Sequence, residues 1–186
     1  MKRKKTWKLK SAVGLLMLVA AFFLPENISS ENSPAAKNKK IAGSSAKKKV
    51  SIENFDADES EILALVNVER QRNNLNALVW DNQLAEIARN YSKRMAGENF
   101  FDHFDPQGAD VVTRAKIAKL KHWSKIGENL FSVENLIDFD AFAVKNWMES
   151  PTHRQNILDR DFNTAGVGIV KSEDGEIFIT QVFIKR

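Results

Sequence analysis

The sequence predicts an α+β fold, a three-layer sandwich in which helices flank a small antiparallel sheet. Three observations support this prediction. Residues 58–69 and 81–95 repeat apolar side chains at helical spacing. Residues 165–170 and 176–184 are rich in β-branched and aromatic residues and enclose a polar turn, a pattern typical of a hairpin. The second of these strands is apolar on both of its faces, so we expect helices on both sides of the sheet.

Two helices are expected at the start of the folded region. The first begins with acidic residues, Asp58 and Glu59, which suit the positive end of a helix dipole, and the NNLN stretch at 73–76 interrupts it. The second has Asp81 as its N-cap and a continuous apolar stripe. We expect Gly97 to end this helix, because glycine readily adopts the left-handed conformation found there.

Shorter elements follow in the middle of the chain. Pro106 excludes regular structure from the loop after the second helix. The pattern then predicts a short helix over 110–120, a strand over 126–131 and a helix over 138–147. A Ser-Pro pair opens a further short helix over 150–158, since serine suits the N-cap and proline the first helical position.

The first 57 residues differ in composition from the rest. Lysines precede an uncharged apolar stretch at 11–24, which has the length of a signal-peptide core and is short for a bilayer span of roughly 20 residues. We interpret residues 1–26 as a signal peptide or an N-terminal membrane anchor, and both options stay open. The Ser- and Lys-rich residues 27–57 are expected to be a disordered linker. The domain at 58–186 is therefore expected in the cell envelope or outside the cell, with a possible tether through 11–24.

Composition excludes several classes of protein. The 186 residues include no cysteine, which excludes a disulfide scaffold, a thiolate zinc site and a cysteine nucleophile. The net charge of +4 comes from the N-terminal segment: residues 1–50 hold twelve Lys and Arg against two acids, whereas residues 51–186 hold sixteen against twenty-two. A mildly acidic folded region argues against nucleic-acid binding.

The candidate chemistry rests on few residues. His103 and His153 lie in polar, turn-forming segments, and His122 is expected to be a surface or packing residue. Glu128 is a charged residue inside the apolar run of the expected strand. A buried carboxylate must be paired or hydrogen-bonded, and histidine is a natural partner for it.

Several segments of the chain occur in the order known from one family. They include GEN at 127–129 and WMESPTHR at 147–154, with further matches at 64–70, 84–88, 103–108, 156–158, 166–168 and 180–183. The set resembles the CAP superfamily, the SCP-like domain of cysteine-rich secretory, pathogenesis-related and venom-allergen proteins and of many bacterial exported proteins. The resemblance covers about residues 58–186 and implies an α-β-α sandwich.

The resemblance also implies a cleft lined by two histidines and two glutamates. Carried over onto this chain, His103 and His153 match the histidines and Glu128 matches the glutamate of GEN. The second glutamate position falls on Ser150, as in many bacterial members. Glu149 stands one residue earlier, about 100° around a helix, and is the candidate for the fourth cleft residue; the alternative is a solvent-facing helix end.

Two classes of function follow from this cleft. Two neutral imidazoles with water or a carboxylate can hold zinc or another divalent cation, so His103 and His153 are the expected metal ligands. The first class is a non-catalytic exported binding module for a small ligand, a lipid or an envelope component. The second is a metal-assisted peptidase or esterase with Glu128 as the base. The sequence has no HExxH pair and no visible activated nucleophile, which favours the binding module.

Overall fold

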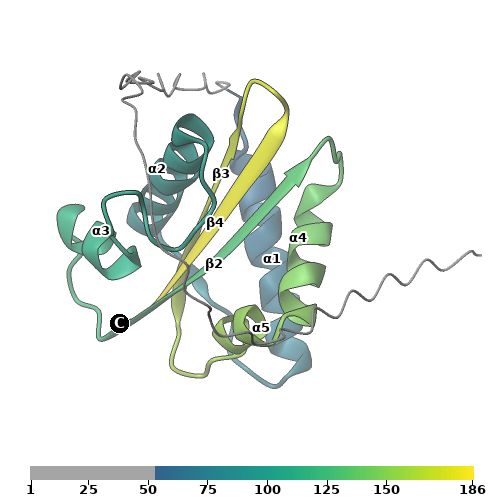
Figure 1. The fold of residues 1–186 in the computed structure, drawn as a ribbon. Helices are drawn as coiled ribbons and strands as arrows, with labels where there is room; N and C mark the ends of the chain where they lie inside the picture. The colour runs from purple at the N-terminus through teal and green to yellow at the C-terminus, as the bar shows by residue number, and fades with distance from the viewer. Residues whose placement is uncertain (1–52) are drawn as a thin grey trace, which may run out of the picture. The chain divides into compact units, whose positions relative to one another are not determined.

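The structure is a computed structural model that describes residues 53–186. The predicted signal peptide or anchor at 1–26 and most of the predicted linker at 27–57 lie outside the described residues. The last two residues of that linker, Asp56 and Ala57, belong to the first helix. Within the described part, no helix is long and apolar enough to cross a membrane. Figure 1 shows the elements, which are α1 (Asp56–Arg72), β1 (Val79–Trp80), α2 (Asn82–Glu98), α3 (Val111–Ile117), β2 (Lys125–Glu134), α4 (Phe139–Glu149), α5 (Pro151–Ile157), β3 (Thr164–Lys171) and β4 (Glu176–Lys185).

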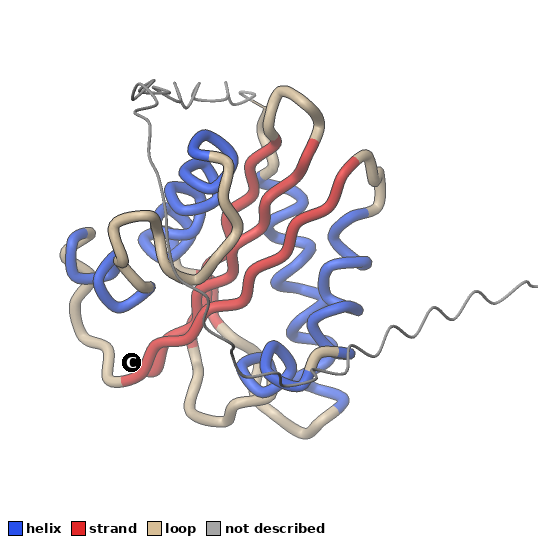
Figure 2. Tube along the Cα trace, viewed as in Figure 1, coloured by secondary structure: helices blue, strands red, loops and turns tan. Residues whose placement is uncertain are grey.

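The four strands form one mixed sheet in the order β1-β3-β4-β2 (Figure 2). β4 is antiparallel to both β3 and β2, and Glu128 of β2 lies opposite Val182 of β4. The predicted α+β sandwich with its small, mainly antiparallel sheet is confirmed, and one short strand adds a detail to it. The two-residue β1 pairs in parallel with β3, with Val79 opposite Thr164. A strand of two residues has no periodicity to read, so no pattern in the sequence indicated it.

Helices cover both faces of the sheet, as predicted: α2 lies on one face, and α1 and α4 lie on the other (Figure 1). The central strand β4 is buried along almost its whole length. Because side chains alternate along a strand, β4 contributes to a core on each side. Ile177, Ile179 and Phe183 pack with Val66 and Trp147 on the α1–α4 side, and Phe178, Val182 and Ile184 face the α2 side with Leu84 and Met95.

The backbone of α2 lies directly on β3. A Cβ atom on Gly168 would come within 2.0 Å of the backbone nitrogen of Arg89, and one on Gly166 within 2.2 Å of that of Ala85. These contacts are with backbone atoms, which cannot move aside as a flexible side chain can. Glycine is therefore required at both positions for the helix to pack at this distance.

Of the two predicted ends of α2, only the N-terminal one agrees with the structure. The Asp81 carboxylate accepts a hydrogen bond from the Leu84 backbone N–H at 2.9 Å, which confirms it as the N-cap. The prediction that Gly97 ends the helix was wrong. Gly97 is helical, and Asn99 takes the left-handed conformation with φ 57°. Asparagine is one of the few other residues that tolerate that conformation.

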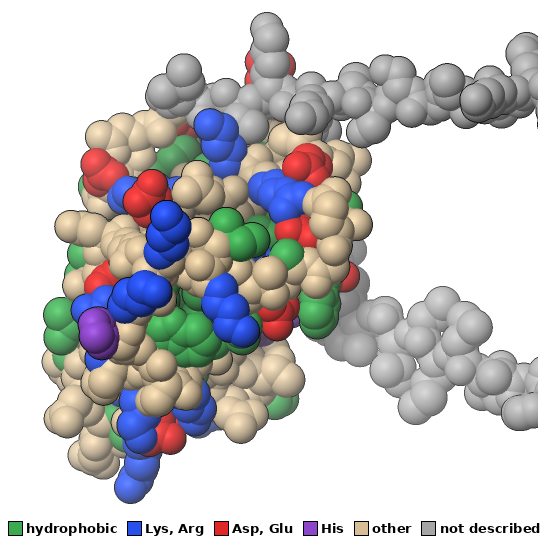
Figure 3. All heavy atoms as spheres, turned by 90° about the vertical axis from the view of Figure 1, so that its left-hand side faces the viewer, with side chains coloured by type: hydrophobic (Ala, Val, Ile, Leu, Met, Phe, Trp, Pro, Cys, Tyr) green, Lys and Arg blue, Asp and Glu red, His purple; other side chains and the backbone are tan. Residues whose placement is uncertain are grey.

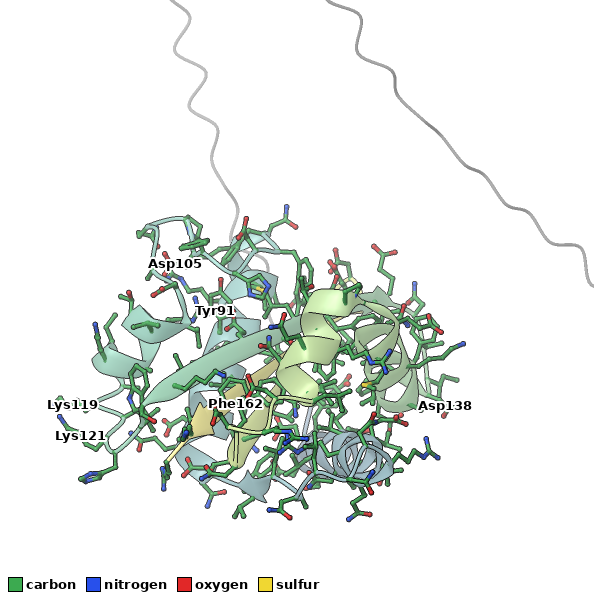
Figure 4. All side chains as sticks on the ribbon, turned by 90° about the horizontal axis from the view of Figure 1, so that it is seen from below. Tyr91, Asp105, Lys119, Lys121, Asp138 and Phe162 are labelled. Atoms are coloured by element: carbon green, nitrogen blue, oxygen red, sulfur yellow. The ribbon has the colours of Figure 1, made fainter. Side chains whose placement is uncertain are left out.

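A buried arginine fixes the loop that follows α5. Arg70 of α1 is 1% exposed, and its guanidinium donates hydrogen bonds to the carbonyl oxygens of Asn76, Ile157, Asp159 and Phe162 at 2.8–2.9 Å. Burial is the main cause that lowers the pKa of Arg70. The side chain thus connects α1 to the segment 157–162, near the Phe162 labelled in Figure 4.

Candidate functional site

Glu128 of β2 lies at the centre of the candidate site. It is 7% exposed, and both of its carboxylate oxygens have a partner. Nδ1 of His103 lies 2.8 Å from Oε1, and Nη2 of Arg114 donates a hydrogen bond to Oε2 over 2.5 Å. A buried carboxylate thus has both a histidine and a permanent cation beside it, which offsets the cost of its burial.

Arg114 of α3 is a site residue that the sequence analysis did not single out. Its guanidinium stacks on the ring of Tyr91 at 3.3 Å from the centroid and also donates to the backbone oxygens of His103 and Ala109. Burial raises the pKa of Tyr91 to about 12, so its hydroxyl stays protonated and donates to the Asp102 carbonyl oxygen. The only available signal was indirect: Glu128 needed a cation, but no spacing rule identifies which one.

The second histidine reaches the same strand from α5. Nδ1 of His153 lies 2.8 Å from the Ser150 hydroxyl, which bonds to this ring instead of capping the helix. Asn129 donates to the His153 carbonyl oxygen over 3.1 Å, and Asn156 donates to the Glu128 carbonyl oxygen over 3.0 Å. The two asparagines therefore hold α5 against consecutive residues of β2.

The two imidazoles have opposite electrostatic environments. The hydrogen bond to Glu128 is the largest cause that raises the pKa of His103. Burial lowers the pKa of His153, and the positive charge of His103 lowers it further. Within residues 53–186, the Nε2 atom of neither ring has a hydrogen-bond partner.

Glu149 lies apart from these residues. It is at the exposed end of α4, where its carboxylate is 3.9 Å from Nζ of Lys145, and it lines a groove with Glu69 and Arg72 of α1. One residue of helical rotation turns its side chain towards α1, and Ser150 occupies the place beside His153. His122 lies between α3 and β2 with φ 58° and is exposed, as expected for a surface residue.

The donor set fits an open metal site better than a closed one. His103 and His153 each have Nδ1 held by an oxygen, an arrangement that fixes the ring and leaves Nε2 without a partner among the described residues, as in many metal-ligating histidines. Among the described residues, however, no group of three or more His, Asp or Glu side chains is placed to hold an ion. Both oxygens of Glu128 are already engaged, so a cation here would have two nitrogen ligands and water.

The comparisons with known proteins point to one family. Residues 63–183 match the family described as "Cysteine-rich secretory protein family", abbreviated CAP. The chain is 34% identical over 128 residues to the uncharacterized membrane protein YlbC of Bacillus subtilis, and 34% identical over 154 residues to the uncharacterized protein YkwD of the same organism. These matches cover 69% and 83% of this chain, but only 34% and 55% of the two relatives.

Solved structures agree with the family match. A Bacillus anthracis extracellular protein containing an SCP domain has a TM-score of 0.62 at 32% identity, covering 70% of this chain and 41% of that one. An outer surface protein of Borrelia burgdorferi has a TM-score of 0.65 at 21% identity, covering 75% of this chain and 98% of that one. The second likeness concerns the fold alone.

Proposed function

The chain belongs to the cysteine-rich secretory protein (CAP) family, and on this premise we propose that it is an exported, non-catalytic binding module. Its proposed site is formed by His103 and His153, which present Nε2 to a divalent cation or a small ligand. The observation that carries this proposal is the pairing of Glu128. Both of its oxygens are used to fix the site, one on His103 and one on Arg114.

The same pairing argues against the alternative, a metal-assisted hydrolase. A general base must offer a carboxylate lone pair to the proton it removes and must have a pKa suited to that task. Arg114 is permanently charged and holds one oxygen of Glu128, while His103 holds the other. Glu128 is then a positioning residue that orients the His103 ring.

We propose zinc or another divalent cation as the metal. The ligands would be the Nε2 atoms of His103 and His153, with water in the remaining positions, and the bound cation would supply a Lewis acid with open coordination sites. Affinity would be modest with only two protein ligands. The raised pKa of His103 lets protons compete with the metal up to higher pH than for an ordinary histidine.

Isothermal titration of the full chain with zinc at about pH 7.5 tests this site. We expect weak binding that His103→Ala and His153→Ala each abolish, because each removes one of two nitrogen ligands. His122→Asn is the matched control, since His122 has φ 58° and asparagine tolerates that conformation. Unchanged binding in both alanine variants, or equal loss in the control, would reject the site.

Export is the second part of the proposal. The Bacillus anthracis relative is described as extracellular, and the basic and apolar N-terminal segment has the composition of an export signal or anchor. The proposed ligands are accordingly small molecules, lipids or components of the envelope. Fractionation of cells should place the domain outside the cytoplasmic membrane. Intact full-length chain in the cytosol would contradict this.

A further inference from the structure

A second concave site lies between α2 and α3. It is a pocket of about 380 Å³, within the range of small-ligand sites. It is distinct from the site above, because His103, Glu128 and His153 do not line it, although Arg114 and Tyr91 border both. Figure 4 shows Tyr91 and Asp105, two of its wall residues, on the α3 side of the molecule. One stripe of α2 forms the other wall, made up of Gln83, Glu86, Ile87, Asn90, Tyr91 and Arg94.

The charges of the pocket favour a cationic ligand over an anionic one. Both arginines in its wall already have carboxylate partners: Arg94 pairs with Asp105 and Glu98, and Arg114 pairs with Glu128. An anion would find no unpaired cation among the residues that line the pocket. The Glu86 carboxylate also lines the pocket, and within residues 53–186 it makes no hydrogen bond or salt bridge.

The apolar part of the pocket is equally well defined. Ile117 of α3 is 73% exposed beside the buried Ile87 and Tyr91 of α2. Gln83 donates to the Ala118 carbonyl oxygen over 2.9 Å and joins the two helices at one end of the pocket. Figure 3 views this side of the molecule and shows a hydrophobic hollow bordered by Lys and Arg side chains.

The polar groups of the pocket differ in whether a ligand can reach them. Arg114 lines the pocket with only 10% of its side chain exposed, and its Nε–H has no partner among the described residues. This nitrogen is enclosed by the protein, so an acceptor oxygen of a ligand in the pocket does not reach it. The Asn90 side chain at the rim is exposed and has no hydrogen-bond partner in residues 53–186, so its amide is the donor that a ligand can reach.

We propose that the α2–α3 pocket binds small amphipathic amines that carry a carbonyl group, of which a short peptide with a free amino group is one example. The protonated amine pairs with Glu86, the carbonyl oxygen accepts from the Asn90 side-chain amide at the rim, and the apolar group packs between Ile87 and Ile117. This proposal does not depend on metal binding at the histidines.

Isoleucine-methyl NMR of the full chain in EDTA tests the pocket with two matched probes. Phenylalaninamide has the amine, the carbonyl and an apolar ring, and 3-phenylpropanamide lacks only the amine. We expect phenylalaninamide to shift the methyl signals of Ile87 and Ile117 while that of Ile157, in α5, stays in place. We expect 3-phenylpropanamide to bind about two- to five-fold more weakly, the range of a solvent-exposed ion pair.

Variants separate the charge from the apolar wall. Glu86→Gln should weaken phenylalaninamide to the level of 3-phenylpropanamide and remove the salt dependence of its binding. Glu61→Gln, an exposed acid of α1 outside the pocket, is the matched control and should change nothing. Ile117→Asn should weaken both probes. Equal binding of the two probes, an unaffected Glu86→Gln variant, or no methyl shifts at millimolar phenylalaninamide would each overturn the proposal.

Discussion

Replacing Arg70 with methionine should strongly destabilise the domain. Methionine keeps most of the apolar stem but removes the donor of four hydrogen bonds. Two of the four carbonyl oxygens, those of Ile157 and Phe162, are bonded in buried surroundings. A buried acceptor left without a partner costs about 1–3 kcal/mol. The free energy of unfolding should therefore fall by about 4 kcal/mol, within a range of about 2–6 kcal/mol.

Urea denaturation of Arg70→Met beside Arg72→Met measures this effect. Arg72 is two residues further along the same helix, its side chain is 68% exposed, and it pairs only with Glu69 at the surface. Its loss should cost less than about 1 kcal/mol. Similar changes in the two variants, or a loss below about 1 kcal/mol for Arg70→Met, would refute the assignment of Arg70 as the side chain that holds the 157–162 loop.

Two further predictions concern pH and packing. The pKa of His103 is raised in the folded state, so its contribution to stability is full below about pH 6.5 and is lost as the pH rises through the folded pKa. The pKa of His153 is lowered in the folded state, so its contribution to stability is full above about pH 6.5 and is lost as the pH falls through the folded pKa. Urea denaturation in EDTA over a range of pH measures both effects. His103→Asn should reduce the loss of unfolding free energy at alkaline pH, and His153→Asn should reduce the loss at acid pH. The same dependence of stability on pH in wild type and both variants would contradict these environments. Gly168→Ala should destabilise the fold by about 1–3 kcal/mol or more, since its Cβ would lie 2.0 Å from the backbone of Arg89. A thermal midpoint equal to that of wild type would show that α2 does not pack this closely.

Much of the fold was predictable because apolar residues recur at a regular spacing in its longer helices and strands. The helical stripe of α2 and the two apolar faces of β4 specify which side chains are buried, and the structure places them as expected. The features that the sequence did not predict depend on very short segments or on contacts between distant parts of the chain. β1 is too short to have a period, and the end of α2 depended on a choice between Gly97 and Asn99 that either residue allows.

The candidate site was predictable only in part, for a different reason. The family resemblance pointed to His103, Glu128 and His153. Which neighbouring residue lies beside His153 depends on the direction in which each side chain points at the end of α4. The chain leaves α4 at Glu149 and enters α5 at Pro151, so Ser150 alone is directed back to His153. Arg114 depends on tertiary packing between α3 and β2, which no spacing in the sequence encodes.

The position of the site follows from the place of β2 in the sheet. β2 is an edge strand, and successive side chains of a strand point to opposite faces. Glu128, opposite Val182, faces the α2 layer, where it meets His103 and Arg114. Asn129 faces the other layer, where its amide holds the His153 backbone of α5.

A central strand could not bring these two histidines together, because neighbouring strands would separate the layers on both sides. At the edge, one histidine comes from the α2 side and the other from the α5 side, and the charge of His103 lowers the pKa of His153. Residues 128 and 129 thus act as a pair, each fixing one histidine from its own layer. Substitution of either should disturb mainly the histidine on its own side, which makes the two halves of the site separable by mutation.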